Sequence, residues 1–483
     1  MEIKQRMSKR LGWLLGVVVL VSIGVLVACG SNYNPSSDGL VLVASQGSGL
    51  IETFSFTLNN GHATAISNTP NDTSSEVCVL NGVPSSIVVD PAGAYSYTII
   101  NANSACDGGT TPSTTGILAF KVNSDGSTTQ VGNLVPFNSE TVTILGTTST
   151  ETVAVSPGMT QGFGPAMVMD PSGKFLFVAD GSTADSSGRN VPGAVSVFAI
   201  GSGGSLKEVA GSPFFMSNFP TTLSQAGLDI VSIAPTPTVF PAIGLNGVQS
   251  AVCSDVGNNP PTLEYLYAVD GLGYQVFEFA VNTTTGVLTN PSTSSSEPAF
   301  PTDPIPAGVA VDPCNRFVYV SDSKTDKVSA YSICNGSVTS QVTACQQLAI
   351  PGALVPVAGS PFSLSGSANG PGPLVVDPFG NFVYVLGTLS NTISPLKISP
   401  ISGALTALTP PTVATGFGPV AITIRADDSW LFVANFGATT VGGTNPSPGG
   451  NTVSQYAVIP ESGALVVQPV IDTDNYPWGV AVN

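Results

Sequence analysis

The residues best able to do chemistry are carboxylates and amides that recur at one position of a repeated pattern. They end the second apolar run of a repeating unit and are Asn101, Asp180, Asp270, Asp322 and Asn435, with Ser45 and Gly387 in the two remaining copies. Oxygen ligands of this kind could line a channel mouth and bind a cation or the hydroxyl groups of a sugar. The alternative is structural, because Asp or Asn after a strand often hydrogen-bonds the backbone of the following loop. Recurrence in most copies favours the structural role.

The sequence contains a single histidine, which limits the catalytic and metal sites that it could form. The only histidine, His62, lies in LNNGHATAI, which predicts a hairpin turn between outer strands. A Ser-His-Asp triad and a His-rich metal centre are therefore excluded, and we expect no metal site. Arg189 and Arg425 are the only other charged candidates for contact with a substrate. No residue is assigned a catalytic role.

Short strands must position these side chains. Residues 306–333 read PAGVAVDPCNRFVYVSDSKTDKVSAYSI, in which a DPCN turn and a polar loop separate three alternating β-branched runs. Period-two alternation bounded by Asp, Pro and Asn predicts consecutive antiparallel strands. The same pattern begins at Pro84, Pro165, Pro373 and Pro419, so the sequence contains a recurring supersecondary unit.

The first and last units are incomplete in complementary ways. Residues 39–56 lack the leading strand of the unit, whereas residues 477–483 match that leading strand alone. We expect the last strand to complete the first unit, a Velcro closure that leaves no open sheet edge. A degenerate copy, with GVQSAVCSD from Gly247 as its leading strand, brings the number of units to seven. The sequence therefore predicts an all-β, seven-bladed β-propeller over residues 39–483.

Three stretches fall outside this pattern. They are rich in Thr, Ser and Pro and span residues 139–164, 215–244 and 291–305. We expect them to be irregular loops between blades.

The N-terminus has the layout of a targeting signal. Residues 1–10 are basic, and residues 11–28 form an uncharged apolar run that ends in Leu-Val-Ala before Cys29 and Gly30. This layout resembles the bacterial lipoprotein signal, in which residues 1–28 would be removed and Cys29 acylated, with residues 29–38 as a polar spacer. The alternative is an uncleaved transmembrane anchor, because the run is just long enough to span. The signal layout and the spacer favour processing.

An acylated Cys29 would attach the protein to a membrane of the bacterial cell envelope. Gly30 at the following position favours the outer membrane, with the propeller facing the periplasm or the cell surface.

The six other cysteines form an even set in an oxidising compartment. The register of the repeat places them pairwise on shared faces or beside one hairpin. A metal site is the alternative, but CxxC spacing is absent. We therefore expect the disulfides Cys78–Cys106, Cys253–Cys314 and Cys334–Cys345.

Composition limits the class of partner. Hydrophobic residues make up 42% of the 483 residues and charged residues 9%, which is too apolar for a disordered protein. The formal net charge is -17, and four of the 13 basic residues lie in the first ten positions. Such a protein would repel nucleic acid, so no nucleic-acid partner is expected.

The segments FVYVSD, FLFVAD and LFVAN behind DPxG-like turns resemble the YVTN repeat. The sequence after Cys29 resembles the seven-bladed lactonase-like propellers, which include bacterial phosphogluconolactonase. The resemblance implies a hydrolase that opens a lactone ring. The lactonising relatives use His, Glu and Arg on the funnel face, but no histidine here matches such a position, and none of those residues is carried over.

Two functions remain open. The favoured one is a binding or scaffold protein that takes a small-molecule, carbohydrate or protein ligand at the funnel, because the histidine is missing and the charge there is low. The alternative is a lactone hydrolase, which rests on the resemblance alone. In either case we expect a monomer without a cofactor, held at the membrane by the acylated Cys29.

Overall fold

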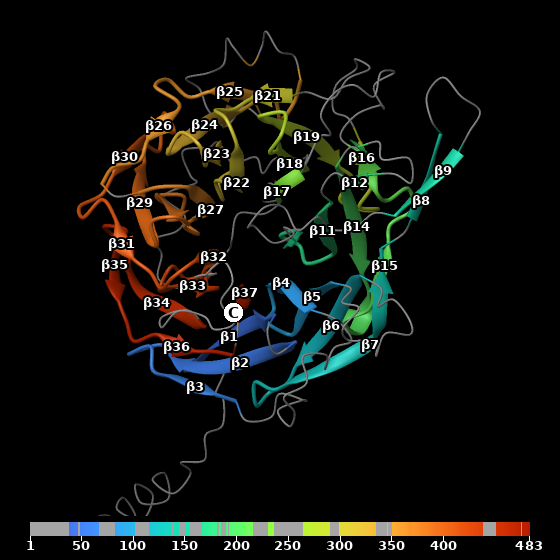
Figure 1. The fold of residues 1–483 in the computed structure, drawn as a ribbon, viewed down its shortest axis with the longest axis horizontal. Helices are drawn as coiled ribbons and strands as arrows, with labels where there is room; N and C mark the ends of the chain where they lie inside the picture. Colours follow the sequence, from blue (N-terminus) through green and yellow to red (C-terminus); the bar gives the residue numbers. More distant parts are fainter. Residues whose placement is uncertain are drawn as a thin grey trace, which may run out of the picture.

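Antiparallel sheets are arranged as blades around a central axis, with their leading strands innermost (Figure 1). The computed structural model describes residues 38–46, 49–66, 83–101, 115–137, 139–143, 150–154, 167–180, 183–184, 190–191, 193–215, 230–235, 264–289, 299–334, 345, 350–366, 368–437, 451–474 and 476–483. Within these ranges no helix is long and apolar enough to cross a membrane. The predicted all-β, seven-bladed propeller is confirmed.

Blade 5 shows the plan of a blade. Its leading strand β22 (Pro306–Val311) pairs with β23 (Phe317–Asp322), which pairs with β24 (Lys327–Ile333). The outer strand consists of two short pieces, β25 (Leu354–Pro356) and β26 (Phe362–Ser363), which both pair with β24.

The other blades follow the same order from the axis outward. Blade 1 contains β37 (Pro477–Val482), β1 (Asp38–Ser45), β2 (Leu50–Thr57) and β3 (Ala63–Ala65); blade 2 contains β4 (Val83–Val89), β5 (Tyr95–Asn101), β6 (Gly116–Val122) and β7 (Thr128–Pro136). Blade 3 contains β10 (Met167–Met169), β11 (Phe175–Asp180), β14 (Ala194–Ile200), β15 (Leu206–Glu208) and β16 (Phe214–Phe215); blade 4 contains β17 (Ile230–Pro235), β18 (Glu264–Asp270), β19 (Gln275–Val281), β20 (Leu288–Thr289) and β21 (Ala299–Pro301). Blade 6 contains β27 (Pro371–Val376), β28 (Phe382–Gly387), β29 (Thr392–Ile398), β30 (Leu405–Ala407) and β31 (Val413–Ala414); blade 7 contains β32 (Pro419–Ile424), β33 (Trp430–Asn435), β34 (Thr452–Ile459), β35 (Ala464–Val467) and β36 (Ile471–Asp472).

The core consists of layers between neighbouring blades. Every residue of β23 is buried, because both faces of this second strand pack against adjacent sheets. One layer joins Tyr265 and Tyr267 of blade 4 to Val318 and Val320 of blade 5. Burial on both faces explains why the second run, FVYV in blade 5, is continuously apolar rather than alternating as expected.

The ring closes as predicted. Strand β37 pairs antiparallel with β1, from Val41 opposite Val482 to Ser45 opposite Pro477. The Leu40 N–H donates to Asn483 Oδ1 at 2.8 Å, which fixes the register at the end of the pair. Blade 1 therefore combines strands from distant parts of the sequence, and the described ring has no unpaired inner edge there.

A repeated contact joins the blades to each other. Gly403, in the outer turn of blade 6, has φ +75°, and a Cβ there would lie 2.5 Å from the Phe317 ring of blade 5. The Tyr319 hydroxyl of blade 5 donates to the Gly403 carbonyl at 3.1 Å, and Tyr384 donates likewise to Gly463 across the next seam. Glycine is required because only a residue without Cβ fits over the ring in this conformation.

The seam between blades 7 and 1 lacks that hydroxyl but keeps the hydrogen bond. Phe432 stands where blades 5 and 6 have tyrosine, and Gln455 instead donates its Nε2–H to the Gly61 carbonyl at 2.9 Å. A buried carbonyl is thus satisfied by a different side chain.

Each of the three stretches expected to be irregular contains at least one strand, so that expectation is wrong where the structure describes them. The leading strand of blade 4 is β17, which pairs with β18, not the segment from Gly247, which lies outside the described residues. The segment IVSIAP alternates and supplies the hydrogen-bond partners that the inner edge of β18 needs. The stretch 139–164 contains a hairpin of β8 (Ser139–Thr143) and β9 (Thr150–Ala154), and β21 lies within 291–305.

Candidate functional site

The predicted polar residues all end second strands. Ser45, Asn101, Asp180, Asp270, Asp322, Gly387 and Asn435 are the last residues of β1, β5, β11, β18, β23, β28 and β33. We call the side of the ring where these strands end the funnel face. Their positions therefore follow the repeat, and the question is whether their side chains are available to a ligand.

Asp322 is withdrawn from solvent. Its side chain is 0% exposed, and one carboxylate oxygen accepts a hydrogen bond from the Ser329 hydroxyl at 2.7 Å. The other oxygen, Oδ1, has no partner. Burial raises the pKa of this carboxyl to about 7, although the Ser329 hydroxyl opposes the shift. A carboxyl that titrates near neutral pH could act as a general base if a substrate could reach it.

Asp270 and Asn435 act within their own blades. Asp270 accepts hydrogen bonds from the Leu272 N–H at 3.0 Å and from Gln275 Nε2 at 3.2 Å. Asn435 Nδ2 donates to the carbonyl and hydroxyl of Thr452, both at 3.1 Å, and to the Ser454 hydroxyl at 2.9 Å. Asp270 thus orders the loop after β18, whereas Asn435 joins the end of β33 to β34. Both bonding patterns fit the structural role considered above.

The remaining strand-ending residues have different bonding partners or no polar side chain. Asn101 Nδ2 donates to the Ser85 hydroxyl at 3.0 Å, and the Ser45 hydroxyl bonds Glu52. A Cβ on Gly387 would meet the hydroxyls of Ser390 and Thr392. The side chain of Asp180 lies outside the described residues. The described members thus bond within their blades, and they do not converge on one open site.

His62 and Arg425 lie away from the funnel face. His62 sits in the turn between β2 and β3, where its carbonyl accepts the Thr57 N–H at 3.1 Å. Arg425 follows the leading strand β32 on the opposite face, where its Nε donates to the Asn483 carbonyl at 2.8 Å and its guanidinium pairs with Asp427. Arg189 lies outside the described residues.

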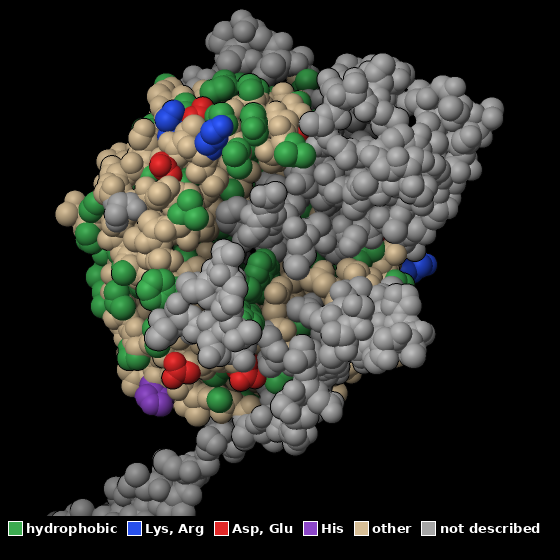
Figure 2. Space-filling model, in the orientation of Figure 1, with side chains coloured by type: hydrophobic (Ala, Val, Ile, Leu, Met, Phe, Trp, Pro, Cys, Tyr) green, Lys and Arg blue, Asp and Glu red, His purple; other side chains and the backbone are tan. Residues whose placement is uncertain are grey.

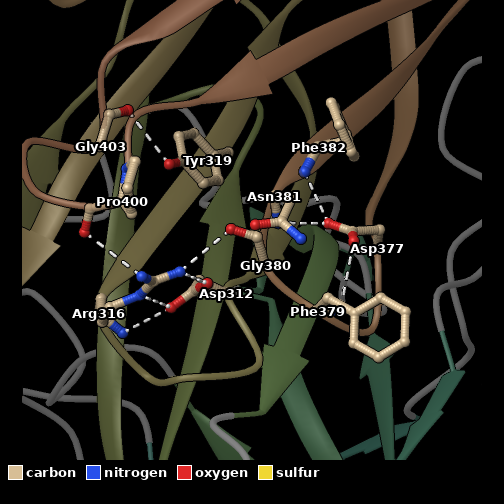
Figure 3. Close-up of polar contacts among 10 residues, drawn as sticks. All are labelled: Asp312, Arg316, Tyr319, Asp377, Phe379, Gly380, Asn381, Phe382, Pro400 and Gly403. Atoms are coloured by element: carbon tan, nitrogen blue, oxygen red, sulfur yellow. Dashed lines mark hydrogen bonds and ion pairs between the residues drawn. The ribbon is translucent and has the colours of Figure 1, made fainter. Parts of the chain in front are cut away.

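Buried charge is concentrated in the turns opposite the funnel face. In blade 5, Arg316 forms two hydrogen bonds with Asp312, from Nη2 at 2.7 Å and from Nε at 2.9 Å. The same guanidinium reaches blade 6, where it donates to the carbonyls of Gly380 at 3.1 Å and Pro400 at 3.3 Å (Figure 3). The Arg316 guanidinium therefore links blade 5 to blade 6.

The neighbouring turn of blade 6 repeats the carboxylate without an arginine. Asp377 accepts the N–H groups of Asn381 and Phe382, both at 2.6 Å (Figure 3). Burial raises the pKa of Asp377 to about 6, against the effect of these hydrogen bonds. Gly380 in this turn has φ +68°, the conformation that the DPxG pattern requires. These residues stabilise turns and are not placed to react with a ligand.

Two further buried carboxyls were not identified from the sequence. Glu278 of β19 is fully buried between blades 4 and 5, both its oxygens lack partners, and burial raises its pKa to about 9. Glu264, at the start of β18, has its pKa raised to about 8, mainly by burial and also by Asp170. An acidic residue inside an apolar run was the only signal for Glu278.

The sulfur chemistry agrees in part with expectation. Cys334 and Cys345 form the predicted disulfide. Cys314 is also disulfide-bonded. Cys78, Cys106 and Cys253 lie outside the described residues, as does Cys29, so the other two predicted pairings remain predictions. Among the residues that the structure describes, no group of three His, Cys, Asp or Glu side chains could hold a metal ion.

The described surface on one face of the molecule is poor in charge. In Figure 2, hydrophobic side chains, other uncharged side chains and backbone atoms make up most of the described surface, and charged side chains are few and scattered. A ligand on such a surface would be held by hydrogen bonds and apolar contacts rather than by ion pairs.

Fold and closure define the class: the protein is a seven-bladed β-propeller whose first blade is completed by its last strand. Residues 259–353 match the family described as Lactonase, 7-bladed beta-propeller. The resemblance to the lactonase-like propellers is thereby confirmed. A comparison with curated proteins found no match in sequence.

Solved structures share this fold. A provisionally named 6-phosphogluconolactonase of Bacteroides uniformis has 18% sequence identity and a TM-score of 0.58, covering 92% of this sequence and 100% of that protein. The periplasmic gluconolactonase PpgL of Pseudomonas aeruginosa has 17% identity and a TM-score of 0.58, covering 92% and 99%. A protein of Lactobacillus plantarum has 14% identity and a TM-score of 0.59, also covering 92% and 99%. At these identities the likeness concerns the fold alone.

Proposed function

We propose that this protein is a ligand-binding propeller of the bacterial cell envelope that holds a small, sugar-like ligand on its funnel face without hydrolysing it. The observation that carries the proposal is that Asp270, Asp322 and Asn435 are buried and that their side chains bond groups of their own blades. Their hydrogen-bonding groups serve the blades, so the described residues include no acid, base and nucleophile aimed at one point. The ligand class is suggested by the gluconolactonases that share the fold.

Binding and turnover separate this proposal from its alternative. The purified protein should bind sugars or sugar lactones in isothermal titration calorimetry, and it should not raise the rate of D-glucono-1,5-lactone opening above the spontaneous rate. Turnover that is abolished by Asp180→Ala or Asp322→Asn would contradict the non-hydrolytic function.

Lactone hydrolysis is the second candidate. It is favoured by the family match over residues 259–353, which includes Asp322. In that case Asp322, with its pKa near 7, would take a proton from the attacking water. The rate of lactone opening should then rise with pH through about 7 and be lost in Asp322→Asn.

The envelope location rests on Cys29 and its signal layout. Acylation at this residue would anchor the propeller to a membrane, because several acyl chains bind a bilayer stably whereas one is marginal. Replacing Cys29 with Ala in the producing bacterium should release the protein from the membrane fraction. Continued sedimentation with detergent-extractable lipid would show that another part of the protein holds it there.

A further inference from the structure

An aromatic cluster lies at the junction of blades 7 and 1 on the funnel face. Phe436 directly follows β33, and Tyr476 and Trp478 flank Pro477, which begins β37. The ring centroid of Phe436 lies 4.9 Å from that of Tyr476 and 4.7 Å from that of Trp478. All three side chains are partly exposed. Partly exposed aromatic faces attract the weakly positive C–H groups on one side of a saturated ring.

Tyr476 is held in a strained backbone conformation. Its φ is +60°, in the left-handed region. The residue before the first proline of the leading strand is Gly370 in blade 6 and Gly418 in blade 7, whereas blade 5 has Ile305. Bulky side chains are disfavoured in this region, and such outliers concentrate at functional sites. The strain is tolerated here at the residue whose ring joins the cluster.

Two hydrogen-bond donors at this junction have no acceptor. Gln46 follows β1, and its backbone N–H donates to the Tyr476 carbonyl at 2.9 Å. The side-chain nitrogens Gln46 Nε2 and Trp478 Nε1 are both buried and lack hydrogen-bond partners. Unpaired buried N–H groups are unfavourable, and a ligand oxygen would satisfy them if the two partly exposed side chains turned outward as it bound.

We propose that Gln46, Phe436, Tyr476 and Trp478 form a subsite for a polyhydroxylated ring. The rings of Phe436, Tyr476 and Trp478 take the C–H face of the ligand, and its oxygens accept the N–H groups of Gln46 and Trp478. This inference rests on the proposed function and deepens it, since it assigns the ligand to the junction of blades 7 and 1. The buried Asp270 and Asp322 in blades 4 and 5 would then lie outside the contact.

The test is calorimetric titration of the full-length protein with D-glucose, D-galactono-1,4-lactone and the acyclic sugar acid D-gluconate. We expect the two cyclic probes to bind more tightly than D-gluconate. Trp478→Phe keeps an aromatic ring and removes the N–H, so it should weaken binding of the cyclic probes about tenfold. Tyr476→Gly should weaken it by at least as much while the thermal unfolding midpoint stays equal or rises, because glycine accepts the left-handed conformation.

Leu389→Ala is the matched control. Leu389 is 73% exposed on the funnel face of blade 6, outside the cluster, so its removal should leave the affinity unchanged. Cyclic probes that bind equally well to wild type, Trp478→Phe and Tyr476→Gly would overturn the subsite and leave a ligand-binding funnel in place. Failure of the wild-type protein to bind any of the three probes would overturn both the subsite and the proposed function.

Discussion

Arg316 offers the sharpest test of how the blades are held together. Arg316→Leu removes the guanidinium group that pairs with Asp312 and donates hydrogen bonds to two carbonyls of blade 6. The side chains of Arg316 and Asp312 are only 3% and 0% exposed, so the variant leaves a carboxylate buried without its partner. Loss of one member of a buried ion pair costs about 3–5 kcal/mol, mostly because the other charge stays buried. We expect a loss near the middle of that range, about 4 kcal/mol.

The measurement is urea unfolding at pH 7, followed by circular dichroism. Asp312→Asn in the Arg316→Leu background removes the stranded charge and keeps an oxygen for the backbone N–H of residue 316, which donates at 3.0 Å. The double variant should recover about 2 kcal/mol of the loss, because replacing a whole buried pair by neutral groups is often close to neutral.

Lys327→Met is the control for an ion pair near the surface. Lys327 Nζ lies 3.0 Å from Asp303 Oδ2, and the two side chains are 34% and 26% exposed. Removing such a pair costs about 0–1 kcal/mol. The reasoning would be refuted if Arg316→Leu behaved like Lys327→Met, or if the double variant were no more stable than Arg316→Leu.

Three further predictions concern stability. Burial raises the pKa of Glu278 from 4.5 to about 9, so the folded protein keeps a proton that the unfolded state releases. The stability due to this group should be complete below about pH 4.5 and be lost as pH rises to about 9. Glu278→Gln should flatten that decline in urea midpoints taken from pH 5 to 9.5; an unchanged slope would show that Glu278 ionises freely. Replacing Cys334 and Cys345 by Ser opens a loop of 11 residues and should cost about 3 kcal/mol in urea unfolding, whereas a loss below about 1 kcal/mol would contradict the loop-entropy argument. Gln455→Leu leaves the Gly61 carbonyl without its donor and should cost about 1–3 kcal/mol. Adding Phe432→Tyr restores the hydroxyl found in blades 5 and 6 and should recover much of that loss in the same assay. If stability did not recover, the tyrosine hydroxyl could not replace Gln455 as the donor to the Gly61 carbonyl.

The blade plan could be predicted because each unit repeats its own local signals. The aspartate before the turn and the Gly or Asn three residues later occur together in DPSG, DPCN and DPFG, and they form the expected turns, with Gly173, Asn315 and Gly380 at positive φ. The sequence between β17 and β18 contains no Asp-Pro-x-Gly or Asp-Pro-x-Asn motif, so the alternating segment IVSIAP could not be placed by analogy. The hairpin of β8 and β9 lies outside the repeat and was missed for the same reason.

The candidate site was only partly predictable. Sequence register placed Asp322 and Asn435 at the ends of second strands, because that position depends on the repeat alone. Their burial and their bonds to Ser329 and Ser454 depend on how the third strand pairs with the second, which no local pattern reports. The cluster of Phe436 and Trp478 joins residues 42 positions apart, and only the closed ring brings them together.

Closure by β37 has a consequence for how the protein folds. The contact between Leu40 and Asn483 spans 443 residues, so blade 1 cannot form until β37 is available. Contacts of such long range slow folding, because the entropy of closing the loop is lost before the contact is gained. Until then the inner edge of the apolar strand β1 is unpaired, and β37 of a second molecule could pair with it. Strand exchange between molecules during folding at high concentration is therefore the characteristic hazard of this architecture.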